Sequence, residues 1–172
     1  MSIQQVPEIV VSTFNRGLDT FAHILSKAEQ HAKENDIDVN SLVDARVVED
    51  QLPLSFQVQF TSRVVRTNLG RLSGEVLPPW DENEKTFEDL KKRVERTQEL
   101  VKSFDLAKTQ GKEGEKFEMH FKGQDHTIYL MDFMLTHVLP NFFFHISTAY
   151  SILRAKGVPL GKEDWLGGFL GL

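Results

Sequence analysis

Four long stretches of the chain place apolar residues with the 3.6-residue period of a helix. They cover residues 7–33, 53–73 and 85–108, and a fourth stretch that ends near Lys156, where Gly157 supplies a common helix stop. Polar segments, some rich in glycine and proline, separate these stretches. Four long helices in one chain predict an all-α fold, an up-down-up-down four-helix bundle.

The second helix is apolar on two nearly opposite sides. One strip holds Phe56, Phe60 and Val64, and the other holds Leu54, Val58, Val65, Leu69 and Leu72. A helix with two apolar sides lies between neighbours. Gln57 and Thr61 fall between the strips, so we expect an edge of polar groups to face inward. The third helix instead carries one apolar stripe among charged residues, as an outer helix does.

The segment before the fourth helix has two interpretations. Residues 117–121 alternate apolar and polar side chains and the turn sequence KGQD follows, which predicts a short β-hairpin with residues 128–130. The alternative places Asp125 or Thr127 at the cap of an earlier start of the fourth helix. Pro140 lies inside the helical pattern, where its missing N–H predicts a kink or a restart of the helix.

The length of 172 residues indicates one domain, residues 1–172, with a core of ordinary size. The glycine-containing tail 158–172 also carries large apolar side chains, among them Trp165 and Phe169. So much apolar area predicts that the tail packs on the bundle or on a partner chain.

Composition narrows the class of protein. Hydrophobic residues make up 40% and charged residues 26%, as in soluble globular proteins. The absence of cysteine excludes disulfides, thiolate metal sites and thiol nucleophiles. A net charge of −5 argues against a nucleic-acid partner, which would require a basic surface. The sequence contains neither a recognisable signal peptide nor a stretch apolar enough to span a membrane. We therefore expect a cytoplasmic protein with no membrane partner.

The fourth helix holds the most informative pattern. His137, Asn141 and His145 recur every four residues, so they lie one above another on the same helix face. Their surroundings, among them Phe142 and Ile146, are apolar on nearly every side, which indicates a buried helix. Buried polar groups need partners. This stripe is therefore the predicted position of a site.

Two segments carry a family resemblance. The run PNFFFHISTAYSILRAKGVPLGKEDWLG, together with LPLSFQVQF at residues 52–60, resembles a family of domains of unknown function grouped with the DinB/YfiT-like four-helix bundles. The resemblance covers nearly the whole chain. It implies a four-helix bundle, and members of the wider superfamily often bind a divalent metal through three histidines, one on the second helix and two on the fourth.

Only one of those three histidines has a counterpart here. Anchored on the shared Leu-Arg…Gly ending at residues 153–157, the resemblance places the second histidine of the fourth helix on His145 and the first on Asn141. The ligand of the second helix falls at or near Gln57. His137, one turn before Asn141, is the nearby candidate to replace a missing ligand.

Three interpretations of these residues remain open. A divalent zinc, nickel or iron ion would have His145 and His137 as its candidate ligands, because neutral amides bind such ions weakly. A polar layer would join Asn141, Gln57 and His145 by hydrogen bonds and fix the helix register. A small-molecule pocket would be lined by Gln57, Asn141, His145 and His137, with His145 as the candidate catalytic acid or base.

The sequence thus predicts a DinB-like helical domain with a degenerate metal-type site that binds a small ligand or serves in association. One alternative is a metal- or histidine-dependent transferase or hydrolase, which rests on the resemblance. Another is a homodimeric structural module, suggested by the apolar tail and the two-sided second helix.

Overall fold

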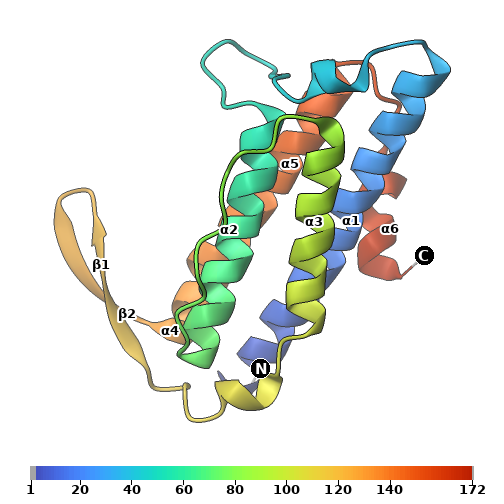
Figure 1. Ribbon diagram of the computed structural model, residues 1–172. Coiled ribbons are helices and arrows are strands. Elements are labelled where there is room, and N and C mark those ends of the chain that lie inside the picture. The colour runs from blue at the N-terminus through green and yellow to red at the C-terminus, as the bar shows by residue number, and fades with distance from the viewer. Residues whose placement is uncertain (1–2, 172) are drawn as a thin grey trace.

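A computed structural model describes residues 3–171 of the chain, and four long helices form its body (Figure 1). They are α1 (Val6–Glu34), α2 (Leu54–Ser73), α3 (Phe87–Lys102) and α5 (Leu139–Ala155). Around the bundle, α1 packs on α3, α3 on α2, α2 on α5 and α5 on α1. The predicted helical bundle is therefore observed, with further short elements added at its ends.

Those short elements are the 3₁₀ helices η1 (Ile3–Gln5), η2 (Val39–Leu42) and η3 (Leu106–Thr109), the strands β1 (Lys116–Phe121) and β2 (Gln124–Tyr129), the helix α4 (Leu130–Phe133), the π-helical turn η4 (Met134–Val138) and the helix α6 (Lys162–Leu170). The two strands pair antiparallel as a hairpin that projects from one end of the bundle (Figure 1).

The order of helix directions differs from the prediction, because α2 and α3 run in the same direction (Figure 1). The start of α3 lies at the start of α2, where the Phe87 N–H donates to the Asn40 side chain at 3.0 Å. The ends of both helices also meet, since Lys108 and Glu75 form an ion pair of 2.8 Å. The expected up-down-up-down order was therefore wrong, and the observed order is up-down-down-up.

The physical cause is the extended segment 74–86, which we call the strap. An extended chain of this length reaches about 40 Å, whereas the 20 residues of α2 rise only ~30 Å. The strap can therefore return along the whole of α2 before α3 begins (Figure 1). Gly70 allows the first residues of the strap to lie close to α2, because a Cβ at this position would be 2.6 Å from the Glu75 carbonyl oxygen.

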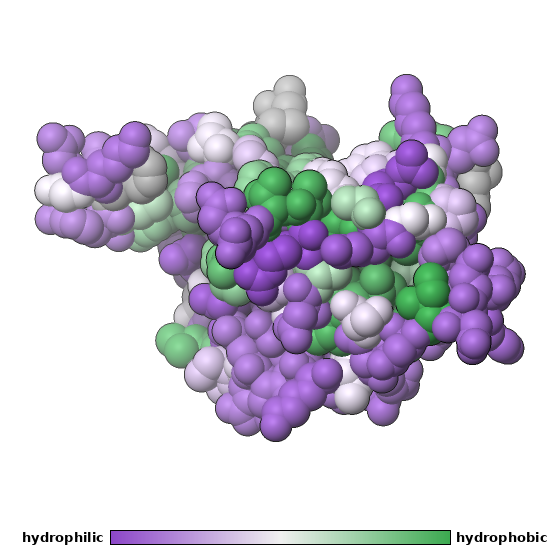
Figure 2. All heavy atoms as spheres, turned by 90° about the horizontal axis from the view of Figure 1, so that it is seen from above, coloured by the Kyte–Doolittle hydropathy of each residue, from purple (hydrophilic) through white to green (hydrophobic). Residues whose placement is uncertain are grey.

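The core follows the predicted faces. The apolar stripe of α1 is fully buried, at 0% exposure for Val10, Phe14, Leu18, Phe21 and Leu25. On α2 both sides are covered, one by α3 and the other by α5, and Gln57 and Thr61 are buried as expected. Seen from the end where α2 and α3 begin, hydrophilic side chains surround small groups of hydrophobic ones (Figure 2).

Local signals explain the ends of α3. The Thr86 side chain accepts from the Asp89 N–H while the Asp89 carboxylate accepts from the Thr86 N–H, a capping box with aspartate in the usual glutamate position. The helix ends at Lys102 and not at Lys108, because Asp105 caps the separate turn η3 by accepting from the Ala107 N–H.

The segment before α5 settles the two interpretations of the sequence. The hairpin is observed, but its second strand is Gln124–Tyr129 and not residues 128–130, so the turn is shorter than KGQD. Asp125 and Thr127 lie inside β2, so the prediction that either caps a helix was wrong. The π-helical turn η4 then precedes Pro140. Proline cannot donate to the preceding turn, and a wider turn accommodates the missing hydrogen bond. The expected irregularity at Pro140 is therefore a π-helical turn.

The tail forms α6, which lies against the outer face of α1 (Figure 1). Arg16 donates to the Phe169 carbonyl at 2.7 Å, and Thr20 donates to the Trp165 carbonyl at 3.2 Å. The Asp164 carboxylate lies 2.8 Å from His23 Nε2, so His23 is exposed but paired. In the part of the chain that is described, no helix is both long and apolar enough to cross a membrane.

Gly17→Ala tests the close packing of α1 on α5. A Cβ at Gly17 would lie 2.7 Å from Cζ of Phe142, whose ring is fully buried against Phe14. Overpacking of this kind costs about 1–3 kcal/mol, which should exceed the ~1 kcal/mol that alanine gains in helix propensity. We expect a lower urea midpoint. The control is Gly114→Ala, where nothing lies within 4 Å and no change is expected; equal midpoints for the two variants would contradict the packing account.

Candidate functional site

A buried hydrogen bond joins α2 to α5 at the predicted site. His145 Nδ1 lies 2.8 Å from Gln57 Oε1, and the two side chains are 7% and 3% exposed. The other end of the Gln57 amide donates from Nε2 to the Leu52 carbonyl, also at 2.8 Å. Gln57 therefore connects the segment that enters α2 with the middle of α5.

These contacts fix the tautomer of His145. If the Gln57 amide were turned over, its oxygen would face the Leu52 carbonyl oxygen, which is repulsive. The amide oxygen must therefore face His145, and Nδ1 must carry the hydrogen that it accepts. Nε2 is then the unprotonated nitrogen of a neutral ring. Among the described residues no hydrogen bond to Nε2 is found.

The surroundings of His145 favour its neutral form. Burial, followed by the positive charge of Arg63, lowers the pKa of His145 from its ordinary 6.5 to about 4. The ring packs against Phe60 at 4.3 Å between centroids and meets the edge of Phe144 at 5.2 Å. The Arg63 guanidinium lies over the Phe60 ring at 4.8 Å. At neutral pH the imidazole is therefore an uncharged hydrogen-bonding group.

The three members of the predicted stripe lie in three different environments. His145 is buried, Asn141 is half-buried and His137 is exposed, with its ring stacked on Phe133 at 4.6 Å. Asn141 and His137 line a small cavity of about 160 Å³ between α2 and α5, which we call the seam cavity. The structure therefore joins Gln57 to His145 by a hydrogen bond. Asn141 and His137 belong to the neighbouring seam cavity instead.

The seam cavity also contains polar residues of α2 that the apolar pattern does not mark. Its lining includes Arg63, Asn68 and Arg71, beside Phe60 of the predicted apolar strip. Arg71 donates to the Asn68 side-chain oxygen at 2.9 Å, and its guanidinium lies 5.2 Å from the Phe133 ring. Positive charge, amide groups and aromatic rings thus share one small space.

The donor groups do not fit the divalent metal that the superfamily implies. The three corresponding positions supply one imidazole and the amides of Gln57 and Asn141, and neutral amides are weak ligands for zinc, nickel or iron. His137 and His145 are two turns apart, roughly 12 Å along the helix, so one ion cannot bind both. Within residues 3–171, no group of three His, Cys, Asp or Glu side chains is placed to hold a metal.

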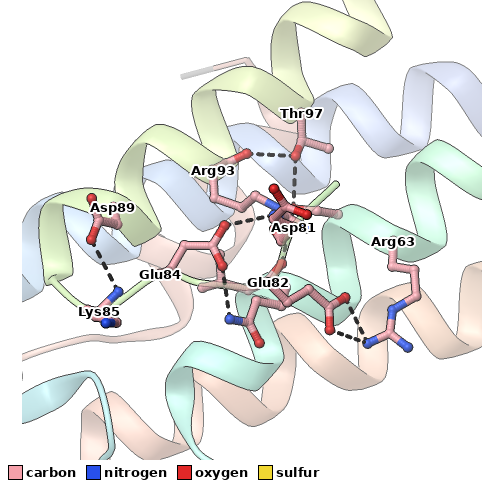
Figure 3. Close-up of polar contacts among 11 residues, drawn as sticks. Arg63, Asp81, Glu82, Glu84, Lys85, Asp89, Arg93 and Thr97 are labelled. Carbon is pink, nitrogen blue, oxygen red and sulfur yellow. Dashed lines mark hydrogen bonds and ion pairs between the residues drawn. The ribbon is translucent and has the colours of Figure 1, made fainter. Parts of the chain in front are cut away.

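The strap pairs with Arg63 of α2, beside this site, and with Arg93 of α3 (Figure 3). Glu82 pairs with Arg63 at 2.9 Å, and Glu84 pairs with Arg93 at 2.7 Å. The second pair is nearly dry, since the Arg93 and Glu84 side chains are 4% and 9% exposed. Gln59 of α2 also donates to Glu84, at 2.9 Å. The strap is therefore fixed to α2 and α3 by charge as well as by packing.

A sequence signal for this arrangement existed. The acidic run at residues 81–84 reads as a solvated approach to α3. However, the arginines of α2 recur at positions 63 and 66, one turn apart, on a helix with no acidic residue of its own. Positive charge on a helix that lies between neighbours is stabilised by an acidic partner. The acidic run is one segment of the sequence that can supply it to Arg63.

Comparison with known proteins agrees with the fold. The family described as domain of unknown function (DUF1993) matches residues 8–166. A crystal structure of a DinB family member protein from Shewanella denitrificans is similar with a TM-score of 0.84 and 28% sequence identity, over 97% of this chain and 96% of that one. No curated protein matches the chain.

The first prediction from this site concerns stability and pH. The pKa of His145 is lower in the folded state than in the unfolded chain, so the unfolded state binds the proton more tightly. Stability should therefore fall as the pH drops from about 6.5 towards 4. The free energy of unfolding should fall less in His145→Gln than in the wild type when the pH is lowered from 7 to 5, as measured by the urea midpoints at the two pH values. His126→Gln, at an exposed histidine, should behave like the wild type; a similar response from both variants would refute the assignment.

The second prediction concerns the hydrogen bond itself. Gln57→Glu replaces the neutral acceptor of His145 by a carboxylate, which favours the protonated ring. We expect the pKa of His145 to rise above its wild-type value of about 4, as followed by NMR titration of the imidazole. The control is Gln124→Glu, which adds the same charge at an exposed position of the hairpin. An unchanged titration in Gln57→Glu would show that the two groups do not interact.

Proposed function

The chain belongs to the family of domains of unknown function DUF1993, and from that premise we propose that it is a DinB-like helical module that binds a small polar molecule in the seam cavity. The single observation that supports this best is the composition of the cavity. Asn141 and His137 of one side and Arg63 and Arg71 of the other line the same space of about 160 Å³. The volume suits a molecule of about five water volumes.

The chemistry of the lining favours a small carboxylate or a similar planar oxyanion. Guanidinium groups donate in a planar fork that matches a carboxylate. Among the described residues Arg71 has no Asp or Glu oxygen within ion-pair distance, so its charge is available to a ligand. Asn141 adds an amide donor, and the Phe60 and Phe133 rings supply flat walls. The Gln57–His145 pair supports this site by holding α2 and α5 together beside it.

Catalysis by His145 is a weaker proposal. A general acid or base works best when its pKa lies near the working pH, whereas the pKa of His145 is lowered to about 4. The transferase or hydrolase alternative therefore rests on the family resemblance alone, and fold-level analogy is weak support for an activity.

Association is also less favoured than ligand binding. The apolar tail suggested it, but α6 lies on α1 of the same chain. The two-sided apolar surface of α2 suggested it too, but α3 and α5 cover both sides. Both features therefore have partners within one copy of the chain.

Acetate is the probe that tests the proposal, with acetamide as its neutral equivalent in shape. Titration of acetate into isotopically labelled protein should shift the NMR signals of Asn141 and Arg71, with an affinity in the millimolar range typical of so small a ligand. Acetamide should shift them less, because it lacks the charge that Arg71 recognises.

Asn141→Ala should weaken acetate binding at least severalfold, whereas Asn83→Ala, at an exposed position, should bind as the wild type does. Absence of any acetate-dependent shift in the wild-type protein would reject the seam cavity as a binding site. Equal binding by the two variants would reject the role given to Asn141.

A further inference from the structure

We infer that a second and larger cavity, at the end of α2 beside the hairpin, binds an organic anion that has an apolar body. This second cavity adjoins the seam cavity, and Thr67 and Arg71 line both. Arg66 and Lys116 line only the second cavity. The inference goes beyond the proposed function, because it concerns a different ligand class and depends on these separate residues.

The cavity has the size of a ligand site. Its volume is about 530 Å³, within the range of roughly 300–1,000 Å³ that is usual for such sites. The last turns of α2, the first residues of the strap and the start of β1 form its walls. Arg66 fixes the strap wall, because its Nη1 donates to the Leu77 and Pro78 carbonyls at 2.5 and 2.7 Å.

The charge of the lining is not balanced. Arg66, Arg71 and Lys116 contribute three positive charges. Within residues 3–171 none of them has an Asp or Glu oxygen within 4.0 Å, so no carboxylate pairs with them directly. Arg71 and Lys116 lie instead over the Phe117 and Tyr129 rings, at 5.2 and 4.4 Å from the ring centroids.

The two carboxylates of the lining are different. Glu75 pairs with Lys108 at 2.8 Å, and Glu115 pairs with Lys112. Both of these lysines lie outside the lining. The negative charges are therefore already neutralised, and the cavity retains positive charge.

Both arginines of the cavity have a lowered pKa. Burial first, and then repulsion from Arg93 and Arg63, lowers the pKa of Arg66, while the nearby charge of Glu82 raises it. Burial also lowers the pKa of Arg71. Both groups stay charged at neutral pH, and an anion bound beside them would offset the loss of solvation.

Apolar side chains complete the cavity. Leu77, Phe117 and Leu130 line it beside the charged groups. Val76 of the strap is 97% exposed at the same place, an unusual position for an aliphatic side chain. Charged donors next to apolar walls match an anion with a hydrocarbon or aromatic part. Carboxylates, phosphate esters and sulfonates share this chemistry.

The test uses two dyes with the same ring system. 1-Anilinonaphthalene-8-sulfonate carries a negative charge, and N-phenyl-1-naphthylamine does not. The folded wild-type protein should bind the sulfonate at least tenfold more tightly, measured by fluorescence titration. Octanoate and octyl phosphate identify which natural headgroup is preferred, since each should displace the dye to an extent that octanol does not match.

Two variants locate the binding. Lys116→Gln and Arg66→Gln should each weaken sulfonate binding about threefold to tenfold and leave binding of the neutral dye unchanged. Arg154→Gln and Lys156→Gln remove the same charges at exposed positions outside the cavity and should have no effect. Because Lys116 lies in the exposed hairpin, its variant keeps the test valid if Arg66→Gln disturbs the strap.

Four results would overturn the inference: no sulfonate binding by the wild type, equal affinity for the two dyes, wild-type affinity in both cavity variants, or displacement of the dye by octanol as well as by the anions. The seam cavity is tested separately, since Lys116→Gln should leave the acetate response intact and Asn141→Ala should leave dye binding intact.

Discussion

The strap determines how the rest of the bundle is arranged. Because the chain returns in extended form along α2, α3 starts at the same end as α2 and runs parallel to it. That leaves the other side of α2 for α5, and so brings Gln57 and His145 into contact. The strap also places carboxylates against Arg63 and Arg93 (Figure 3). Helix direction, the polar pair and the charged surroundings of the site all depend on this one connection.

A polar pair in the middle of a helix contact has a defined use. The hydrogen bond between Gln57 and His145 can form at only one register of α2 against α5, so it selects that register over apolar packing alone. Its neutrality matters as well. A charged imidazole at this depth would lack a carboxylate partner, and such burial is costly. The amide at position 57 gives His145 an acceptor without stabilising the charged ring.

The sequence correctly predicted which helix faces are apolar and buried. It did not predict the direction of the helices or how deeply the polar side chains are buried. The two covered sides of α2 and the inward position of Gln57 followed from periodicity. The direction of α3 did not, because an apolar period is the same in either direction. The four-residue spacing predicted one helix face for His137, Asn141 and His145, whereas His137 lies in the π-helical turn η4 and the other two in α5. It could not show that the π-helical turn at His137 and the position of Gln57 would give them different burial. Whether they bind a ligand stays a prediction.

The contact between α6 and α1 has a consequence for synthesis of the protein. Arg16 and Phe169, which are joined by a hydrogen bond, are separated by 153 positions in the chain. The helix α1 therefore leaves the ribosome long before the residues that cover its outer face. Contacts of such high sequence separation form late. The nascent chain therefore exposes the surface around Thr20, on which Gly168 docks, until α6 has emerged, and a chaperone that recognises uncovered helices would find it there.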